Sequence, residues 1–390
     1  MSDQVPFANY QYEIYLRGMG GQRPARPLDW RMLERDAYRL LADGPRGYIK
    51  GGAGRGKTMR ANRDAFERWR IVPRMLRDVS ERTLARELLG TALPAPVLLA
   101  PIGVQTLAHP EGELAAVRAA AEVGVPFVAS TAASHTIEDI AQAAGDLPCW
   151  YQLYWPRDRE LARSFVARAE RAGYRAIVLT LDTWMLGWRP ADLTNGFLPF
   201  LWGEGNRNYL QDPVFRAALP APPEENMQAA IGHWAWQFAN PAITWEDLAF
   251  LRDITDLPLV LKGILHPDDA RLAVEHGAQG VIVSNHGGRQ VDGAIGALDA
   301  LPEVVEAVGG RCAVLFDSGI RSGSDALKAL ALGAGAVLLG RPYIWGLALG
   351  GQTGVVEVLR SFLGDLDLAM ALSGYAAIDD VDGGALRARD

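Results

Sequence analysis

Residues 313–340, AVLFDSGIRSGSDALKALALGAGAVLLG, contain one complete strand–helix–strand unit and set the pattern for most of the chain. Apolar runs occupy both ends of this stretch, at Ala313–Asp317 and Ala336–Gly340. Such nearly continuous apolar runs suit parallel strands covered on both faces better than half-exposed antiparallel strands. Between them, Ser324–Leu332 has a helical pattern and ends at Gly333, a residue that commonly terminates helices. The stretch therefore predicts two parallel strands joined by a helix.

The same alternation begins near residue 97. Helices are predicted at Glu111–Val123, at Pro267–His276, and at Thr136–Ala144, where Thr136 and Asp139 form a capping-box pattern. Six strand candidates precede the unit above, at Val97–Pro101, Phe127–Ser130, Cys149–Tyr154, Ala176–Leu181, Leu259–Lys262 and Gly280–Ser284. No antiparallel hairpin signal is visible. Eight strands alternating with helices predict an α/β fold, a (β/α)8 TIM barrel. A doubly wound sheet is the alternative, because strand number alone does not force closure.

Two regions depart from this alternation. The first precedes the barrel and carries predicted helices near Trp30–Ala42 and Arg60–Trp69, and the second is a long excursion after the fourth strand. A loop this long inside a compact domain is usually a lid, a binding loop or a disordered segment. The chain is thus predicted to comprise an N-terminal helical cap at 1–96 within the same domain, a barrel at 97–374 with a lid at 187–243, and a tail at 375–390. The lid is expected to pack, at least in its first half, through Trp188, Phe197, Phe200, Trp202, Tyr209 and Phe215.

Composition excludes several classes of partner. The 390 residues are 49% hydrophobic and 22% charged, which suits a large core. With 39 Lys and Arg against 46 Asp and Glu, the formal charge of −7 argues against nucleic acid or an anionic membrane as partner. Cys149 and Cys312 lack the spacing of a disulfide framework or a zinc site, so no metal is predicted. Without a signal-peptide pattern or a membrane-spanning apolar run, we expect a soluble, cytoplasmic protein.

Residues Gly51–Thr58, GGAGRGKT, match the phosphate-binding loop pattern G-x-x-x-x-G-K-[ST]. Such a loop needs a buried strand leading into it, so that its amides and lysine converge on phosphates. The preceding residues DGPRGYIK contain Gly44, Pro45 and Gly47, which break any such strand. We therefore interpret the motif as an accidental match in a glycine-rich turn rather than as a nucleoside-triphosphate site.

Polar residues gather where the predicted strands end, which is where barrels place their active sites. Glycines beside Ser318, Arg321 and Arg341 suit a phosphate, with salt bridges to helix ends as the alternative. Lys262 ends an apolar strand, where it can face an electron-rich cofactor atom or form an ion pair in the barrel mouth.

The turn SNHGGRQ places His286 three residues before Arg289. A histidine of near-neutral pKa can accept a proton, and an arginine nearby can hold a carboxylate through two hydrogen bonds. On its own, His286 could equally be a structural histidine.

These motifs together resemble the FMN-dependent α-hydroxy acid oxidase family. The resemblance covers about Glu13 to Gly374 and rests on APIGVQTLAHPEGE, YQLY, TLDT, LKG, SNHGGRQ and DSGIRSGSDALKALALGAGAVLLGRP. Within the family, YEIY, LTLDTWMLGWRPADLT, FLPF, TWEDL, LKGILHPDDA and GRPYIWGLALGG most resemble the lactate 2-monooxygenase branch. Gly103, where many relatives carry alanine, and Trp188, where many carry arginine, fit that branch.

The resemblance implies a role for each matching residue. His286 is the base that takes a proton from the substrate, and Asp182 stabilises the resulting imidazolium. Tyr154 contacts the substrate side of the flavin and is the third catalytic residue, beside His286 and Asp182. The substrate is bound by Tyr48, Tyr154, Arg189 and Arg289. FMN is bound by Pro101, Ile102, Gly103, Ser130, Gln152, Thr180, Lys262, Ser284, Asp317, Ser318, Gly319, Arg321, Gly340 and Arg341, with Lys262 at the flavin N1/O2 edge.

The implied reaction is oxidation of a small L-2-hydroxy acid, foremost L-lactate, with O2 as the electron acceptor. If the keto acid stays bound, peroxide decarboxylates it, and lactate and O2 become acetate, CO2 and water. The alternatives are an oxidase that releases keto acid and peroxide, a dehydrogenase that uses another acceptor, an enzyme of larger aryl hydroxy acids, and a non-catalytic FMN barrel. Family resemblance also implies a homo-oligomer, a tetramer or an octamer.

Overall fold

A computed structural model describes residues 5–389, so the first four residues of the expected cap and the last residue of the expected tail lie outside it. Eight parallel strands form a closed barrel, which confirms the TIM barrel and excludes the doubly wound sheet. The barrel strands are β4 (Val97–Leu99), β5 (Phe127–Ser130), β6 (Cys149–Leu153), β7 (Ile177–Thr180), β8 (Leu259–Ile264), β9 (Gly280–Val283), β10 (Ala313–Phe316) and β11 (Ala336–Leu339). Closure comes from pairing of β11 with β4, at Val337 with Val97 and Leu339 with Leu99.

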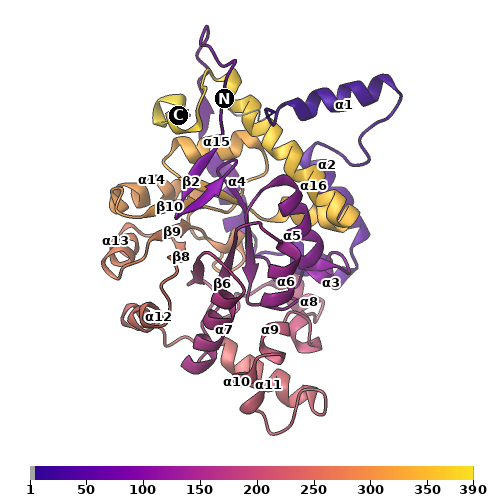
Figure 1. Cartoon of the computed structure of the whole chain (residues 1–390), viewed down its shortest axis with the longest axis vertical. Helices are drawn as coiled ribbons and strands as arrows, with labels where there is room; N and C mark the ends of the chain where they lie inside the picture. The colour runs from indigo at the N-terminus through magenta and orange to yellow at the C-terminus, as the bar shows by residue number, and fades with distance from the viewer. Residues whose placement is uncertain (1–4, 390) are drawn as a thin grey trace.

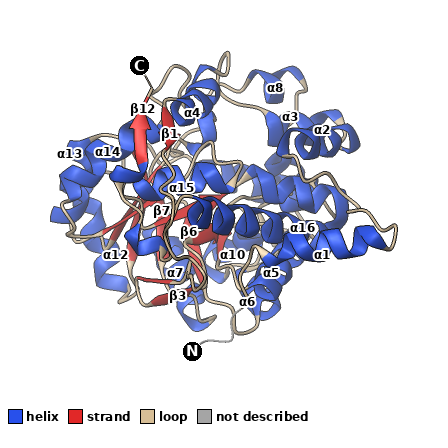
Figure 2. Ribbon diagram, turned by 90° about the horizontal axis from the view of Figure 1, so that it is seen from above, coloured by secondary structure: helices blue, strands red, loops and turns tan. Residues whose placement is uncertain are grey.

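Helices surround the barrel (Figure 2). The expected capping box is present, because Thr136 Oγ1 accepts the Asp139 N–H and Asp139 Oδ2 accepts the Thr136 N–H. The surrounding helices are α5 (Gly112–Val123), α6 (Ile137–Ala144), α7 (Arg159–Arg171), α12 (Leu248–Ile254), α13 (Pro267–Glu275), α14 (Ala297–Val308), α15 (Gly323–Ala331) and α16 (Arg341–Leu372). Short 3-10 turns complete the chain: η1 (Gln105–Leu107), η2 (Pro199–Trp202), η3 (Trp245–Asp247), η4 (His286–Gly288), η5 (Ile378–Asp380) and η6 (Gly383–Ala385).

An antiparallel hairpin closes one end of the barrel, so the expectation of no hairpin was wrong. Strands β2 (Arg86–Leu88) and β3 (Thr91–Leu93) pair through a turn at Leu89 and Gly90, both of which have positive φ. Such two-residue turns usually carry Asn-Gly or Asp-Gly, and leucine in the first position hides the signal. The hairpin's Leu88 and Leu93 pack against the residues that fill the barrel interior, and Trp150 Nε1 donates to Thr91 Oγ1 at 3.2 Å.

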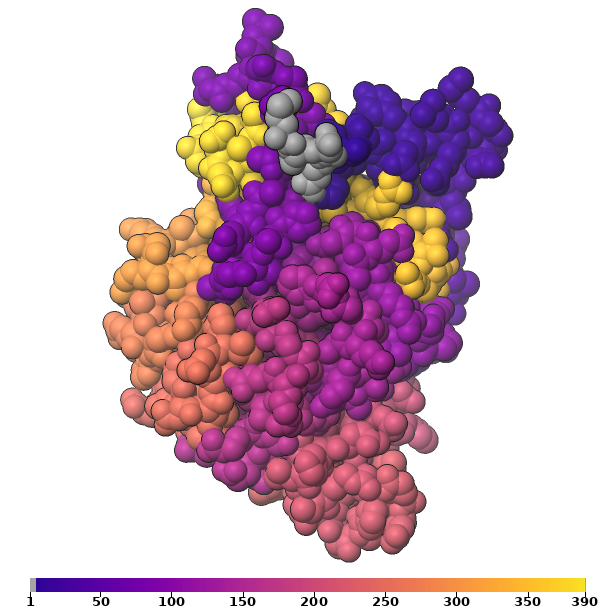
Figure 3. Space-filling model, viewed as in Figure 1, coloured from indigo at the N-terminus to yellow at the C-terminus, as the bar shows by residue number. Residues whose placement is uncertain are grey.

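The N-terminal region contains four helices and packs along α16. Two of them, α2 (Trp30–Leu40) and α4 (Lys57–Glu67), are those expected from the sequence, whereas α1 (Asn9–Met19) and α3 (Asp43–Lys50) were not expected. Helix α1 stands out from the body of the molecule in Figures 1 and 3. After α4, strand β1 (Trp69–Ile71) pairs with β12 (Leu386–Ala388), so two segments far apart in the sequence lie side by side.

The excursion between β7 and β8 folds into short helices at one end of the molecule (Figure 1). These are α8 (Pro190–Thr194), α9 (Arg207–Leu210), α10 (Pro213–Ala217) and α11 (Met227–Phe238). Phe200, Tyr209 and Phe215 are buried as expected, whereas Trp188 and Trp202 are each 74% exposed. In the part of the chain that the structure describes, no helix is both long and apolar enough to cross a bilayer.

Candidate active site

A cavity opens at the carboxyl ends of the barrel strands. It encloses about 1180 Å³ of empty space including its open mouth. The expected site residues that line it are Tyr48, Pro101, Ile102, Gly103, Tyr154, Arg189, Lys262, His286, Arg289, Asp317, Ser318, Gly319, Arg321, Gly340 and Arg341. The other expected residues lie at the strand ends without lining the cavity: Ser130, Gln152, Thr180, Asp182 and Ser284.

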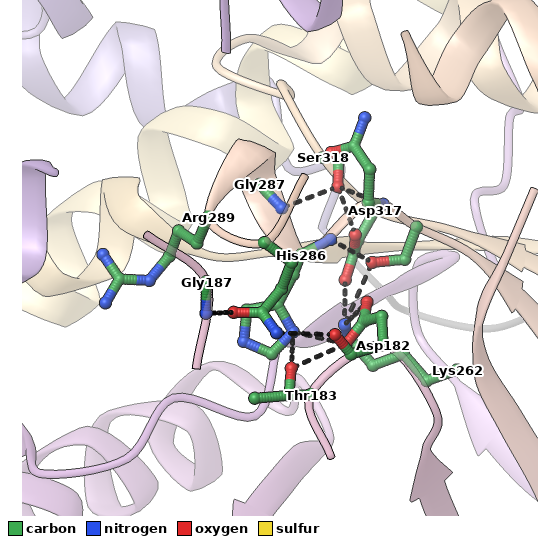
Figure 4. A network of polar contacts seen from close by, with 12 residues as sticks. Asp182, Thr183, Gly187, Lys262, His286, Gly287, Arg289, Asp317 and Ser318 are labelled. Atoms are coloured by element: carbon green, nitrogen blue, oxygen red, sulfur yellow. Dashed lines mark hydrogen bonds and ion pairs between the residues drawn. The ribbon is translucent and has the colours of Figure 1, made fainter. Parts of the chain in front are cut away.

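His286 enters the cavity from the turn after β9 and is held by two partners (Figure 4). Its Nδ1 lies 2.7 Å from Asp182 Oδ1 and 3.0 Å from Thr183 Oγ1. Thr183 also donates to Asp182 Oδ1 at 2.8 Å, so the carboxylate is fixed in place. With the Nδ1 proton shared with a carboxylate, Nε2 is the ring nitrogen left to accept a proton.

The charges around His286 favour its neutral form. Burial and the nearby Lys262 lower the pKa of His286 below its ordinary value, although Asp182 opposes them. Burial works against the charge on Asp182, but Lys262 and His286 outweigh it and hold the pKa of Asp182 well below its usual range. The pair is therefore a neutral imidazole oriented by an ionised carboxylate, which is the arrangement a general base requires.

Lys262 is buried, and the ion pair in the barrel mouth that the sequence suggested is present. Its Nζ donates to Ser284 Oγ at 3.0 Å and lies 3.7 Å from Asp182 Oδ2 and 3.5 Å from Asp317 Oδ2. Burial lowers the pKa of Lys262, but the two carboxylates outweigh burial and raise it, so the amine stays charged. Lys262 thus forms ion pairs in the barrel mouth while it lines the cavity.

Two arginines on the cavity wall have no carboxylate partner among the described residues. Arg289 donates to the backbone carbonyls of Tyr48 and Gly51, and its guanidinium lies 4.9 Å from the centre of the Tyr48 ring. Arg189 donates to the Arg289 carbonyl at 3.0 Å and to Gln290 Oε1 at 2.6 Å. Burial and the neighbouring Arg289 lower the pKa of Arg189 to about 10. Two adjacent cations without an anion favour a site for a carboxylate.

A second group of cations lies at the ends of β10 and β11. Burial, Arg341 and Arg63 lower the pKa of Arg321 to about 10, and its guanidinium forms no ion pair within the described chain. Arg341 also lines the cavity, and it donates to the carbonyls of Ile49, Gly51 and Gly287 at 3.1–3.2 Å. The C-terminal end of α3 thus takes up this cation, as helix C-termini commonly do.

The polar groups at the strand ends around the cavity fit FMN. At the ends of β5 and β6, Gln152 Oε1 accepts from Ser130 Oγ at 2.9 Å, while the buried Gln152 Nε2 has no partner and calls for an acceptor such as a flavin carbonyl. Arg321 suits the FMN phosphate, because its guanidinium has no anionic partner within the described chain. At Gly103 the backbone approaches Ala132 so closely that a Cβ would lie 2.6 Å from the Ala132 oxygen. Glycine at this position therefore allows the segment after β4 to pack closely against Ala132.

Several lining residues were missed from the sequence. Thr183 stands beside Asp182 in the TLDT motif, which could have revealed it. Phe200 and Phe238 come from the excursion, where Phe200 stacks on Trp234 at 4.9 Å and Phe238 meets Tyr154 at 5.2 Å. Ala132 and Leu186 also line the cavity. They could not be predicted, because an apolar residue in a loop gives no sequence signal that it lines a cavity.

The barrel brings a carboxylate-paired histidine and several arginines without ion-pair partners among the described residues to one cavity. Residues 37–388 match the family described as FMN-dependent dehydrogenase, and the chain belongs to that family, whose cofactor is FMN. The protein is an FMN-dependent 2-hydroxy-acid oxidase or dehydrogenase.

Relatives and solved structures agree with this assignment. The chain is 47% identical over 367 residues to an L-lactate oxidase of Lysinibacillus sphaericus (strain C3-41), which covers 94% of each chain. It is 42% identical to 2-Hydroxyacid oxidase 1 of Homo sapiens, over 90% of this chain and 93% of that one. A crystal structure of mandelate oxidase matches with a TM-score of 0.82 and 42% identity, covering 93% of this chain and 98% of that chain. The family expectation is confirmed, whereas these names support its oxidases rather than its lactate 2-monooxygenase branch.

Proposed function

We propose that this protein oxidises a small L-2-hydroxy acid, foremost L-lactate, to the 2-keto acid and passes the electrons to O2, releasing H2O2. The observation that carries the proposal is that His286, oriented by Asp182, lines the same cavity as Arg189 and Arg289. A base and two cations on one cavity suit a substrate whose oxidisable carbon is next to a carboxylate.

Each residue has a definite part in this proposal. Arg189 and Arg289 hold the substrate carboxylate, and the Tyr48 hydroxyl completes that site. His286 Nε2 takes one proton from the substrate, and Asp182 stabilises the imidazolium. Burial raises the pKa of Tyr154, so its hydroxyl stays protonated and serves as a hydrogen-bond donor on the substrate side.

The remaining predicted site residues, on the cavity wall and at the strand ends behind it, are proposed to hold the cofactor. FMN supplies a two-electron acceptor, so that the substrate loses two electrons and two protons and O2 gains them as H2O2. Lys262 places a permanent positive charge beside the ring. Pro101, Ile102, Gly103, Ser130, Gln152, Thr180 and Ser284 surround the ring, and Asp317, Ser318, Gly319, Arg321, Gly340 and Arg341 surround the phosphate end.

The fate of the keto acid separates two outcomes of the same chemistry. Release is favoured by the names of the relatives, an L-lactate oxidase and a 2-hydroxyacid oxidase. Retention, followed by decarboxylation to acetate, CO2 and water, is the second candidate, because Phe200 and Phe238 of the excursion line the cavity and can delay departure. The resemblance further supports a homo-oligomer, a tetramer or octamer.

One experiment tests the proposal. L-lactate is added to the purified protein without oxygen while the flavin absorbance is followed, and air is then admitted. We expect bleaching of the flavin, followed by its return with equal amounts of pyruvate and peroxide. Acetate and CO2 in place of pyruvate would instead establish the second candidate. A flavin that lactate and other 2-hydroxy acids fail to bleach would overturn both.

A further inference from the structure

The loop that resembles a phosphate-binding loop already holds an anion, and that anion belongs to the protein itself. Helix α3 rather than a strand leads into Gly51–Thr58, which confirms that the match is not a nucleotide site. Yet the Arg55 N–H donates to Asp292 Oδ2 at 2.7 Å, and the Lys57 N–H donates to Asp292 Oδ1 at 2.6 Å. The Asp292 carboxylate thus occupies the place at the start of α4 that a phosphate would take in a nucleotide-binding loop.

The fit between the loop and Asp292 is close. Gly54 has a φ of 50°, and a Cβ on it would lie 2.5 Å from Asp292 Oδ2, so only glycine leaves room for the carboxylate. Beside it, Thr58 Oγ1 donates to the Val291 carbonyl at 2.7 Å and accepts the Ala294 N–H at 2.9 Å. Residues 291–294 are therefore fastened to the beginning of α4 on both sides of Asp292.

The same loop connects the three segments that carry the proposed carboxylate-binding groups. The Ala53 N–H donates to the Gly288 carbonyl, and the Gly54 N–H donates to the Trp188 carbonyl, each at 2.9 Å. Gly51 accepts from Arg289 Nη1 at 2.8 Å. Residues 51–58 thus join the end of α3 that carries Tyr48, the segment that carries Arg189, and the turn that carries Arg289.

We propose that Asp292 is a positioning residue for the substrate carboxylate, acting through the 51–58 loop to set the distance between Arg289, Arg189 and Tyr48. The inference rests on the carboxylate-binding role proposed above. Asp292 does not line the cavity, so it touches neither substrate nor cofactor. Its removal frees the Arg55 and Lys57 amides and loosens the segment from which Arg289 is oriented. Within the described chain, Asp317 and Arg321 at the cofactor end form no hydrogen bond with residues 51–58. Arg341 does donate to the Gly51 carbonyl at 3.2 Å, so a small change in FMN affinity is expected.

Asp292→Ala and Asp292→Asn test this in the FMN-loaded protein. We expect KM for L-lactate to rise about tenfold in Asp292→Ala, equivalent to weakening one charge-assisted hydrogen bond, with kcat and FMN affinity changing less than about threefold. Asp292→Asn should rescue part of the loss, because its amide oxygen still accepts one of the two N–H groups. Oxalate, a dicarboxylate without an oxidisable C–H bond, should show the same loss of affinity when its binding is followed by flavin absorbance.

Asp29→Ala is the matched control. Asp29 also accepts two backbone N–H groups at a helix start, from Arg31 at 2.9 Å and Met32 at 3.0 Å, but it belongs to α2 and does not line the cavity. We expect this variant to lose thermal stability without a change in KM. A rise in KM in both variants would show that any lost helix cap disturbs the site and would overturn the inference.

Limited trypsin digestion separates this inference from the proposed function. Arg55 and Lys57 are trypsin sites inside the loop, so Asp292→Ala should be cut there about tenfold faster than the parent protein, whatever reaction the enzyme performs. Unchanged digestion and unchanged oxalate binding would overturn the inference and leave the oxidase proposal standing. If digestion is faster but the protein oxidises no 2-hydroxy acid, both the oxidase proposal and the carboxylate-positioning role are refuted. Asp292 would then only stabilise the 51–58 loop.

Discussion

Removal of the Arg321 side chain should change the stability of the apoprotein and its affinity for FMN in opposite directions. Arg321 lies among cations, with its guanidinium 5.1 Å from the centre of the buried Trp345 ring and no ion pair within the described chain. Arg321→Met keeps most of the side-chain length and removes the charge. The apoprotein then loses an uncompensated cation, while the FMN phosphate loses a partner.

The pKa of Arg321 gives the size of the expected change in apoprotein stability. A fall from the ordinary 12.5 to about 10 corresponds to about 3 kcal/mol of unfavourable free energy for the charged form in the folded apoprotein. The guanidinium also donates to the Ile320 carbonyl at 2.8 Å, and loss of that bond offsets about 1 kcal/mol. We therefore expect the apoprotein of Arg321→Met to be more stable by about 1–2 kcal/mol. The lost phosphate contact, about 1.5–3 kcal/mol, corresponds to FMN affinity weaker by about 10- to 150-fold.

The assay is thermal unfolding of the apoprotein in a buffer free of phosphate and sulfate, together with FMN titration by fluorescence. Arg63→Met is the matched control, because Arg63 pairs with the buried Asp325 at 2.7 Å and its removal should destabilise the apoprotein. An Arg321→Met apoprotein that melts at or below the parent temperature would refute the account of Arg321 as an uncompensated cation. Unchanged FMN affinity would refute its phosphate contact.

Three further outcomes are expected. His286→Asn should bind FMN normally but reduce it about 10²- to 10⁴-fold more slowly in anaerobic stopped flow, since a general base contributes about that much; reduction at the parent rate would exclude His286 as the base. Because the pKa of His286 lies below its ordinary 6.5, the unfolded chain takes up this proton first, so the His286 contribution to stability should fall as the pH drops below about 6.5. The ratio kcat/KM should fall only at a lower pH, where His286 of the folded enzyme is protonated, and should reach a plateau at neutral pH. A profile that still climbs above pH 8 would contradict this. Phe238→Ala should raise kcat/KM for mandelate relative to lactate by about tenfold, since an aromatic wall of the cavity is removed; an unchanged ratio of the two kcat/KM values would show that Phe238 does not limit substrate size.

Most of the barrel could be predicted from the sequence, because buried parallel strands are apolar throughout and short. Each predicted strand overlaps the observed one, as for Phe127–Ser130, which matches β5. The hairpin at Leu88–Leu93 was missed because its strands have three residues each and its turn starts with leucine. Such a short pair is stabilised by packing against the barrel interior rather than by its own local preferences.

Some residues of the candidate site could likewise be predicted from the barrel pattern, whereas others could not. His286, Lys262 and Arg321 follow predictable strands, so the barrel rule places them at one rim. Tyr48 and Arg189 lie on segments without regular alternation, and only family resemblance pointed to them. The direction of the Arg341 side chain was not predictable at all, since it depends on carbonyls at the end of α3, a helix from a distant part of the chain.

The pairing of β1 with β12 has a consequence for the order in which the protein assembles during synthesis. Trp69, Arg70 and Ile71 leave the ribosome long before their partners Ala388, Arg387 and Leu386. Leu386 is buried against this edge, and the Val72 N–H donates to the Ala385 carbonyl at 2.8 Å. A nascent chain therefore leaves the β1 edge exposed until translation has passed Ala388. Chaperone binding to stalled chains should be strongest at this edge, and it should end when the final strand is added.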